Sequence, residues 1–351
     1  MDRLMRAAVY RGVNDVRPER IPVPSIGPGE ALMRVAACGV CGTDLKKVAH
    51  GLVPPPRVFG HEMAGTLVRV GPDVQGWKAG DRVVAHHHVP CGACFYCARR
   101  LYAHCPLYKR TATTAGFEPA GGGFAEYVRI MDWAVARGLV RIPEHISFEE
   151  AAFLEPLNTC LKAVRRLGTA EGDTVLVLGQ GQIGLLFTML LVRFGVRVVA
   201  CDRMPSRLRR AEERGAETLL AGAEQSLAQA LRDRTEGRGA DGAIVAAPDS
   251  RAVTDAMQAV RPGGRVLLFA HTRLQDPVEV DAGAVCMLEK DLIGSYSADV
   301  ESQEECARIL FRREIDVRGL ITHRFSLEQI QEAIRLASSP TDDSLKVMVI
   351  P

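Results

Sequence analysis

The pattern of hydrophobic and polar residues divides the chain near residue 156. Before that point, short apolar runs alternate with turn residues such as Pro28-Gly29, which is typical of a β-rich domain. Among these runs, 31–37 and 82–85 are predicted strands. After residue 156, short apolar runs alternate with helical segments, and this pattern predicts a doubly wound parallel sheet.

The second part begins with a predicted helix, since apolar residues share one helical face over 157–167 and Gly168 terminates it. Six strands separated by helical segments are then predicted, at 174–178, 196–201, 218–221, 242–247, 265–270 and 291–296.

The remaining residues carry two helical patterns, near 301–312 and 327–337, and a last apolar run at 346–350. Because the first part lacks closing elements, we expect this tail to return to it. The chain is therefore expected to form an α/β protein with three segments. These are a β-rich domain at 1–156, a parallel-sheet domain at 157–296, and a C-terminal segment at 297–351 that completes the first domain.

Charge and hydropathy exclude several classes of protein. The 351 residues include 44 Lys+Arg and 42 Asp+Glu, a balance that argues against a nucleic-acid partner. The segment 174–192 is uncharged and nominally long enough to span a bilayer. Its glycines would break such a helix, so no membrane segment is expected. The first residues, MDRLMRAAVYRG, hold no apolar stretch of signal-peptide length, so we expect a cytoplasmic protein.

A glycine-rich turn follows the first strand of the second part. In Gly179-Gln-Gly181-Gln-Ile-Gly184, the first glycine permits a tight turn, the second lets backbone amides approach a pyrophosphate, and the third lets the helix pack closely on the strand. The helix N-terminus then offers amides and a partial positive charge to phosphate groups. This spacing predicts a dinucleotide site.

Asp202 ends the next predicted strand, 23 residues after Gly179, near the expected interval of about 20. A carboxylate there accepts hydrogen bonds from the ribose hydroxyls of NAD and repels the additional phosphate of NADP. Arg203 and Arg207 follow closely and could accept that phosphate instead. We expect NAD to be preferred over NADP.

Four cysteines lie within 15 residues, a density that favours a metal site. Thiolates at this spacing close a tetrahedral shell around Zn²⁺ and leave no position for substrate. Disulfides are disfavoured by a cytosolic context, and an iron–sulfur cluster by the absence of a ferredoxin-like continuation. A structural zinc lobe is therefore predicted at about 88–110, with ligands Cys91, Cys94, Cys97 and Cys105. Four further cysteines are expected to be buried small apolar residues: Cys160, Cys201, Cys286 and Cys306.

A second, mixed set of ligand types is scattered along the chain. It comprises a cysteine, a histidine and carboxylates, at Cys41, His61, Glu62 and Glu155. Mixed shells with an exchangeable position are the catalytic kind of zinc site. Either Glu62 or Glu155 could be the third ligand, with the other acting through water. Asp44 could orient the imidazole of His61.

Together these motifs resemble the zinc-containing medium-chain dehydrogenases/reductases over essentially the whole chain. The resemblance rests on CGVCGTD (38–44), GHE (60–62), GDRV (80–83), CGACFYC (91–97), GGFAEY (122–127), LEPL (154–157) and GQGQIG (179–184). The combination of LEPL and GHE is most similar to the sorbitol (polyol) and threonine dehydrogenase branches.

The resemblance implies a fold, two zinc ions per chain and a set of residue roles. The fold is a GroES-like β domain with an inserted Rossmann domain, commonly assembled as dimers or tetramers. Thr43 matches the hydroxyl that relays the alcohol proton, and Ile183, Asp202 and Arg207 match cofactor-binding positions. Where the family often has a histidine to pass the proton outward, this chain has Lys46. His50, Lys47 or water could take that role.

Two functional hypotheses follow. The first is a zinc-dependent dehydrogenase that transfers a hydride from a secondary alcohol, such as a polyol, sugar alcohol or hydroxy amino acid, to NAD(P). The second, motivated by Lys46, is a regulatory or structural protein that binds nucleotide and zinc without turnover. The small-molecule alcohol or ketone depends on a pocket that we expect loops 45–58, 107–121 and 271–290 to shape.

Overall fold

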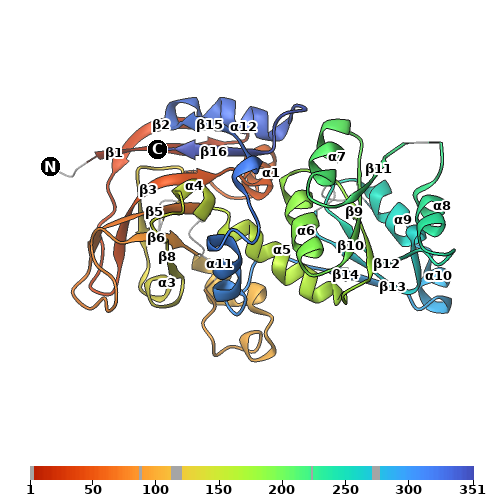
Figure 1. Cartoon of the computed structure of the whole chain (residues 1–351). Helices are drawn as coiled ribbons and strands as arrows, with labels where there is room; N and C mark the ends of the chain where they lie inside the picture. The colour runs from red at the N-terminus through yellow and green to blue at the C-terminus, as the bar shows by residue number, and fades with distance from the viewer. Residues whose placement is uncertain (1–3, 87–88, 112–120, 223, 271–276) are drawn as a thin grey trace. The chain divides into compact units, whose positions relative to one another are not determined.

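The computed structural model describes residues 4–86, 89–111, 121–222, 224–270 and 277–351. The chain divides into two compact units, one formed by Met1–Asn158 with Ala298–Pro351 and the other by Thr159–Ser297 (Figure 1). The first residue of the expected zinc lobe, 88, lies outside the described residues.

The first unit is rich in antiparallel strands. A three-stranded sheet has the order β2-β1-β4, and a second sheet has the order β15-β16-β3-β5-β6-β8, with β7 also paired to β3. The strands are β1 (Leu4–Gly12), β2 (Asp15–Pro22), β3 (Ala31–Gly39), β4 (Arg57–Val58), β5 (Glu62–Val70), β6 (Arg82–Ala85), β7 (Tyr127–Ile130), β8 (Leu139–Arg141), β15 (Ile321–Ser326) and β16 (Lys346–Ile350).

Helices and 3₁₀ turns connect the strands of this unit. They are α1 (Gly42–His50), α2 (Pro106–Thr111), α3 (Asp132–Arg137), α4 (Phe148–Ala151), α11 (Gln303–Phe311) and α12 (Ile330–Ser338), with the 3₁₀ turns η1 (Cys97–Arg99), η2 (Tyr102–His104), η3 (Arg318–Leu320) and η4 (Leu327–Gln329). Helix α5 (Leu154–Leu167) begins in this unit and continues into the second.

The C-terminal strand completes the first unit's larger sheet. β16 pairs antiparallel with β3, with Met348 opposite Gly39, and parallel with β15. Its residues are almost fully buried, because an apolar strand in the middle of a sheet is covered on both faces. The last apolar run of the sequence therefore closes the sheet that the first hundred residues begin.

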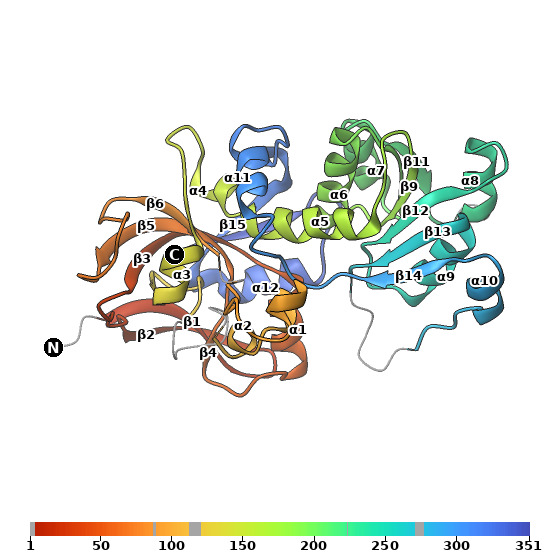
Figure 2. The ribbon, with the colours of Figure 1, turned by 90° about the horizontal axis from the view of Figure 1, so that it is seen from below.

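The second unit is a six-stranded parallel sheet of order β11-β10-β9-β12-β13-β14. This is the classic order of doubly wound nucleotide-binding sheets. Helices α6 and α7 cover one face, and α8 and α9 cover the other (Figures 1 and 2). The elements are β9 (Thr174–Leu178), α6 (Gln182–Arg193), β10 (Arg197–Asp202), α7 (Pro205–Glu212), β11 (Glu217–Leu220), α8 (Leu227–Arg234), β12 (Ala240–Val245), α9 (Ser250–Ala259), β13 (Val260–Leu268), α10 (Ala282–Met287) and β14 (Asp291–Gly294).

The predicted fold class, a β-rich domain plus a doubly wound parallel sheet, is confirmed, and all six predicted strands are present. No helix within the described ranges is long and apolar enough to cross a membrane. The uncharged segment 174–192 is instead a strand, a turn and the helix α6.

Two local predictions were wrong. Cys286 is exposed, because it lies in the short helix α10, which buries none of its residues. The segments expected to be loops contain most of α1, most of α2 and all of α10, since short helices satisfy part of their backbone hydrogen bonding locally. The parts at 112–120 and 271–276 lie outside the described residues.

Candidate active site

The pairing of β3 with β5 brings Cys41 close to His61 and Glu62. Gly39, at the end of β3, lies opposite Glu62, at the start of β5. Cys41 follows two residues later as the N-cap of α1, where its Sγ accepts a hydrogen bond from the Thr43 amide at 3.4 Å. The sheet register therefore places residues 20 positions apart in sequence at one point in space.

These three side chains have the geometry of a metal site. One ligand atom from each of Cys41, His61 and Glu62 lies within 4.8 Å of the other two. The imidazole is buried, and its Nδ1 lies 3.3 Å from Asp44 Oδ1. This contact orients the ring and leaves Nε2 for a metal ion, as outer carboxylates commonly do. A sulfur, a nitrogen and an oxygen donor fit Zn²⁺.

Asp44 and Cys41 determine the charge of His61. Burial alone would lower the pKa of this imidazole, but the Asp44 carboxylate and the Cys41 thiol raise it well above its usual value. Asp44 is itself 2 % exposed. The Asp44 carboxylate and the Cys41 thiol therefore favour positive charge on the imidazole.

Glu155 lies in the first turn of α5 and is 6 % exposed. Burial raises the pKa of its carboxyl to about 7, and the charges of His61 and Glu62 act on it in opposite directions. Glu155 thus faces the cluster electrostatically, although it is not among the three residues whose ligand atoms lie within 4.8 Å of one another. The two candidate glutamates therefore approach the cluster from different elements.

Glu62 has a partner that the sequence analysis missed. The Nζ of Lys346 forms an ion pair with Glu62 Oε2 and donates to the Val40 carbonyl at 3.1 Å. Both side chains of the pair are 1 % exposed. The signal was a single lysine at the head of the otherwise apolar strand β16, since a fully buried lysine requires a charged partner.

The proposed proton-relay positions lie along α1. Thr43 is an exposed residue in its first turn, and His50 is exposed at its last. Lys46 is half-buried, and burial lowers the pKa of its ammonium group. Lys47 lies over the ring of Phe59, 5.7 Å from its centroid.

The four cysteines of the predicted lobe converge within one short segment. Their Sγ atoms lie within 4.8 Å of one another, with Cys94 and Cys97 3.4 Å apart. This separation is far longer than a disulfide bond of about 2.05 Å. Backbone amides of Ala93 and Cys94 lower the pKa of the Cys91 thiol to about 6. Four converging sulfurs, one of them readily ionised, fit a tetrahedral zinc ion.

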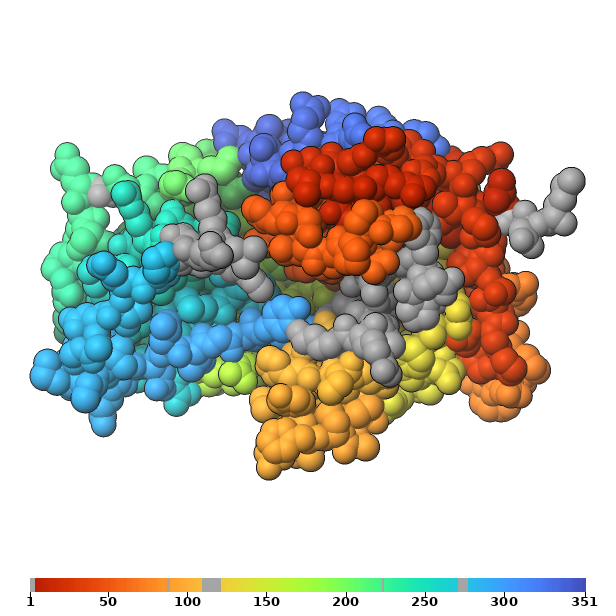
Figure 3. Space-filling model, turned by 180° about the vertical axis from the view of Figure 1, so that it is seen from behind, coloured from red at the N-terminus to blue at the C-terminus, as the bar shows by residue number. Residues whose placement is uncertain are grey.

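The lobe has little apolar core of its own. Its cluster of buried residues consists of Cys97, Cys105 and Tyr108, whereas Phe95 is 62 % exposed. The lobe projects from the surface of its unit (Figure 3), and Tyr102 anchors it by a 2.5 Å hydrogen bond to Glu301. Its shape therefore depends on what the four sulfurs hold.

The glycine turn of the second unit has the geometry that its spacing predicts. Gly179 adopts φ +92°, and a Cβ on Gly184 would lie 1.8 Å from the Gly179 carbonyl oxygen, so α6 packs directly on the turn. Gly181 is the N-cap of α6 and forms no side-chain cap, and a Cβ there would lie 3.9 Å from a guanidinium nitrogen of Arg207. The first amides of α6, including that of Ile183, are therefore available for phosphate oxygens.

Asp202 lies at the end of β10, beside this turn. Its Oδ2 accepts from the Gln180 amide at 2.6 Å, and its Oδ1 from the Met204 amide at 2.9 Å. A guanidinium nitrogen of Arg207 lies 3.9 Å from Oδ2. The carboxylate is thus held rigidly, with an arginine at hand to contact a ribose or a phosphate.

Comparisons with known proteins agree with a zinc site in the first unit and a dinucleotide site in the second. Residues 27–144 match the family model "Alcohol dehydrogenase GroES-like domain", and residues 183–312 match "Zinc-binding dehydrogenase". The chain is 31 % identical to the sorbitol dehydrogenase of Bacillus subtilis, covering 99 % of this chain and 97 % of that protein. The chain belongs to the zinc-type alcohol dehydrogenase family.

Other members of this family are similar over nearly the whole chain. The L-threonine 3-dehydrogenase of Pyrococcus furiosus is 30 % identical, over 90 % of each chain. The crystal structure of a zinc-binding dehydrogenase from Sinorhizobium meliloti, bound to NADP, superposes with a TM-score of 0.89 at 28 % identity, covering 99 % of this chain and 100 % of that one. The predicted family, fold and reaction class, an NAD(P)-linked oxidoreductase acting on CH–OH groups, are confirmed.

Proposed function

We propose that this zinc-type dehydrogenase oxidises a polyol, sugar alcohol or hydroxy amino acid, with one catalytic and one structural zinc ion per chain and with NAD as the preferred coenzyme. The convergence of Cys41 and His61 beside two buried glutamates, Glu62 and Glu155, carries the proposal. The sorbitol and L-threonine dehydrogenases among its relatives support the substrate class.

In this proposal Cys41, His61 and a glutamate hold the catalytic ion, and Cys91, Cys94, Cys97 and Cys105 hold the structural one. A zinc ion at the first site supplies a Lewis acid that lowers the pKa of an alcohol hydroxyl, and NAD supplies the hydride acceptor. Asp44 keeps the His61 ring in the tautomer whose Nε2 can bind the ion. The Thr43 hydroxyl takes the alcohol proton and passes it to water, since Thr43 is exposed.

The assay is turnover of purified protein with NAD or NADP across a panel of polyols, sugar alcohols and hydroxy amino acids, together with zinc content. We expect reduction of NAD and two zinc ions per chain. Coenzyme binding without turnover on any alcohol or ketone would support the non-catalytic alternative. A zinc content near one would show that one of the two sites does not bind the ion.

We further propose that Glu155 is the direct third ligand of the catalytic zinc ion. In this proposal the ion pair with Lys346 prevents Glu62 from binding the metal. The buried ion pair supports this assignment, because a carboxylate already neutralised by a buried ammonium gains less from a second cation.

Glu155→Gln should therefore lose the zinc of the Cys41 site. Glu62→Gln combined with Lys346→Met should retain the zinc ion. The double change removes both charges of the pair, so neither is left buried without its partner. Zinc content measured by mass spectrometry checks this. Loss of one ion from the double variant, with both ions kept in Glu155→Gln, would reverse the assignment.

The preference for NAD rests on Asp202. Asp202→Ala should raise KM for NAD by roughly tenfold to a hundredfold, since a hydrogen bond to a charged group contributes about 1.5–3 kcal/mol. The ratio of kcat/KM for NADP over NAD should rise at the same time, because Arg207 remains. Asp233→Ala, which removes an exposed aspartate of α8, is the control. An unchanged coenzyme ratio would exclude this role for Asp202.

The proposal also covers the domain boundaries, the cellular location and the oligomeric state. The proposed domain boundaries, after residues 156 and 296, lie close to the division between the two units. A cytoplasmic location is supported by the ten free cysteines, which are typical of reducing compartments.

A homo-dimer or homo-tetramer is supported by β14, an edge strand near which Met287 is 81 % exposed and Leu292 40 % exposed. Light scattering of the purified protein tests the assembly.

A further inference from the structure

Helix α11 ends in an arginine where a glycine would be the usual residue. The Arg313 amide donates to Leu310 O at 3.0 Å, and the Glu314 amide donates to Ile309 O at 3.0 Å. These two bonds form a Schellman motif, and its left-handed position is occupied by Arg313 at φ +52°. A side chain in this conformation is sterically costly, so its contacts indicate what the arginine does there.

The guanidinium of Arg313 binds a buried carboxylate on a neighbouring element. Its Nε donates to Glu150 Oε1 at 2.8 Å, and its second nitrogen donates to Glu150 Oε2 at 3.3 Å and to the His145 carbonyl at 2.8 Å. The Glu150 side chain is only 7 % exposed. A bidentate ion pair with a buried carboxylate fixes the orientation of the carboxylate as well as its distance from the guanidinium.

Glu150 also initiates the helical segment that leads to Glu155. Its carboxylate accepts from the amide and hydroxyl of Ser147, which forms a capping box at the start of α4. The amide of Phe153 then donates to Glu150 O, and the amide of Leu157 donates to Phe153 O. These two hydrogen bonds link Glu150 through Phe153 to the first turn of α5.

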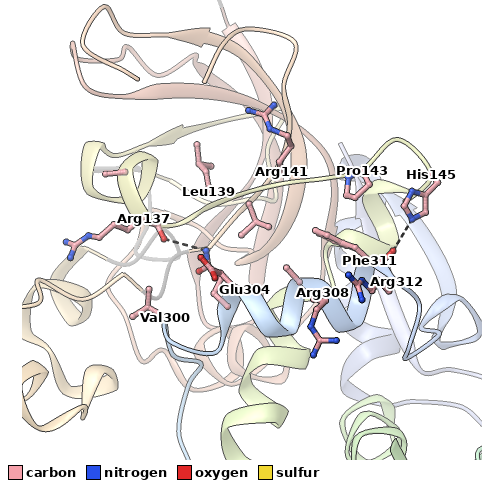
Figure 4. A pocket seen from close by; sticks show the side chains of 14 residues that line it. Arg137, Leu139, Arg141, Pro143, His145, Val300, Glu304, Arg308, Phe311 and Arg312 are labelled. Carbon is pink, nitrogen blue, oxygen red and sulfur yellow. Dashed lines mark hydrogen bonds between the residues drawn. The ribbon is translucent and has the colours of Figure 1, made fainter. Parts of the chain in front are cut away.

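Helix α11 also contacts this part of the chain at Leu154 and at His145, which precedes α4. Cys306 Sγ donates to the carbonyl of Leu154, the residue before Glu155, at 3.6 Å, and Cys306 is fully buried. The imidazole of His145 lies 2.9 Å from the Phe311 carbonyl (Figure 4). Two contacts from α11 and one from Arg313, which follows it, thus lie along the stretch 145–154 that precedes Glu155.

We propose that Arg313 is a positioning residue that fixes Glu155 against the Cys41–His61 cluster through Glu150. This rests on the proposed function, in which Glu155 is a zinc ligand. The left-handed arginine is then explained, because glycine would suit the backbone but could not reach Glu150. The C-terminal segment of the chain thereby takes part in building a metal site whose donors all come from the first 155 residues.

The experiment replaces catalytic-site zinc by Co²⁺, whose visible absorption reports the ligand geometry of a thiolate-containing site. Arg313→Gly relieves the backbone and removes the guanidinium. Its affinity for Co²⁺ at the Cys41 site should fall about tenfold to a hundredfold, as for other outer residues that orient a ligand, and its visible band should shift. Arg313→Lys keeps the charge but loses the two-pronged geometry, so it should fall between wild type and Arg313→Gly.

Arg312→Ala is the matched control. It removes the neighbouring positive charge, but Arg312 lines a pocket of about 780 Å³ whose walls include residues of α11, α3 and β8 (Figure 4), and its loss should leave the cobalt spectrum unchanged. Glu150→Gln is the second variant, because glutamine at this position preserves the capping box. It should reproduce the loss of affinity even if Arg313→Gly folds poorly.

Unchanged cobalt spectra and affinities in both Arg313→Gly and Glu150→Gln would overturn the proposal, whatever happens to their stability. If the wild-type protein bound no ion at the Cys41 site, the proposed function itself would fail instead. The two failures are thus distinguishable.

Discussion

Cys41→Ser should lower kcat/KM by about a thousandfold or more while leaving the melting temperature nearly unchanged. The loss follows because the Lewis acid contributes several kcal/mol to transition-state stabilisation, and each 1.36 kcal/mol corresponds to a factor of about ten. The fold should be retained because Cys41 is the N-cap of α1, and serine is among the best N-cap residues.

The measurements are steady-state kinetics, zinc content and thermal unfolding of the same preparations. We expect one zinc ion to remain, in the cysteine lobe. Cys286→Ser is the control, because Cys286 is exposed and belongs neither to the four-cysteine lobe nor to the Cys41–His61 cluster. Undiminished turnover by Cys41→Ser would remove the basis of the proposed mechanism.

Cys94→Ser should have the opposite signature, with a melting temperature lower by roughly 5 °C or more and loss of the other zinc ion. A structural zinc site contributes folding free energy directly, about 10–16 kcal/mol in isolated zinc-finger peptides. In this lobe the buried cluster is limited to Cys97, Cys105 and Tyr108. Few apolar contacts therefore remain to hold the segment once the ion is gone.

Thermal unfolding and limited proteolysis near residues 91–105 measure this effect. We expect Cys94→Ser to be cleaved there, while wild type and Cys41→Ser resist. Equal melting losses in Cys41→Ser and Cys94→Ser would contradict the assignment of one site to catalysis and the other to stability.

The sites differ in how far apart in sequence their residues lie, and this decides how well each could be predicted. The cysteine lobe and the Gly179–Gly184 turn are local, and spacing alone predicted that their atoms converge. The strands of the second unit were likewise predicted, because a buried parallel strand is a continuous apolar run that a turn and a helix follow.

The mixed site was predicted as a set of named residues, without the geometry that brings them together. Its assembly depends on the register of β3 against β5, since Gly39 opposite Glu62 decides that Cys41 meets His61. A shift of one residue would turn every side chain of the strand to the other face of the sheet. No local pattern encodes that register, although the resemblance to a family anticipated its result.

For two contacts, no sequence pattern could identify the partner residue. Lys346 pairs with Glu62 across 284 positions, and Arg313 pairs with Glu150 across 163. Each lies in the C-terminal segment, whose sequence shows a strand and a helix but not which carboxylate they approach.

The sequence by itself thus determined the elements, the cysteine lobe and the nucleotide turn, because these depend on hydrophobic periodicity and on spacings of a few residues. Only the tertiary structure decided how Cys41, His61, Glu62 and Lys346 converge, and how α11 reaches the segment before Glu155. The physical reason is that contacts between distant residues are fixed by strand register and by the closure of β16 on β3. These in turn depend on the packing of the whole unit rather than on any single segment.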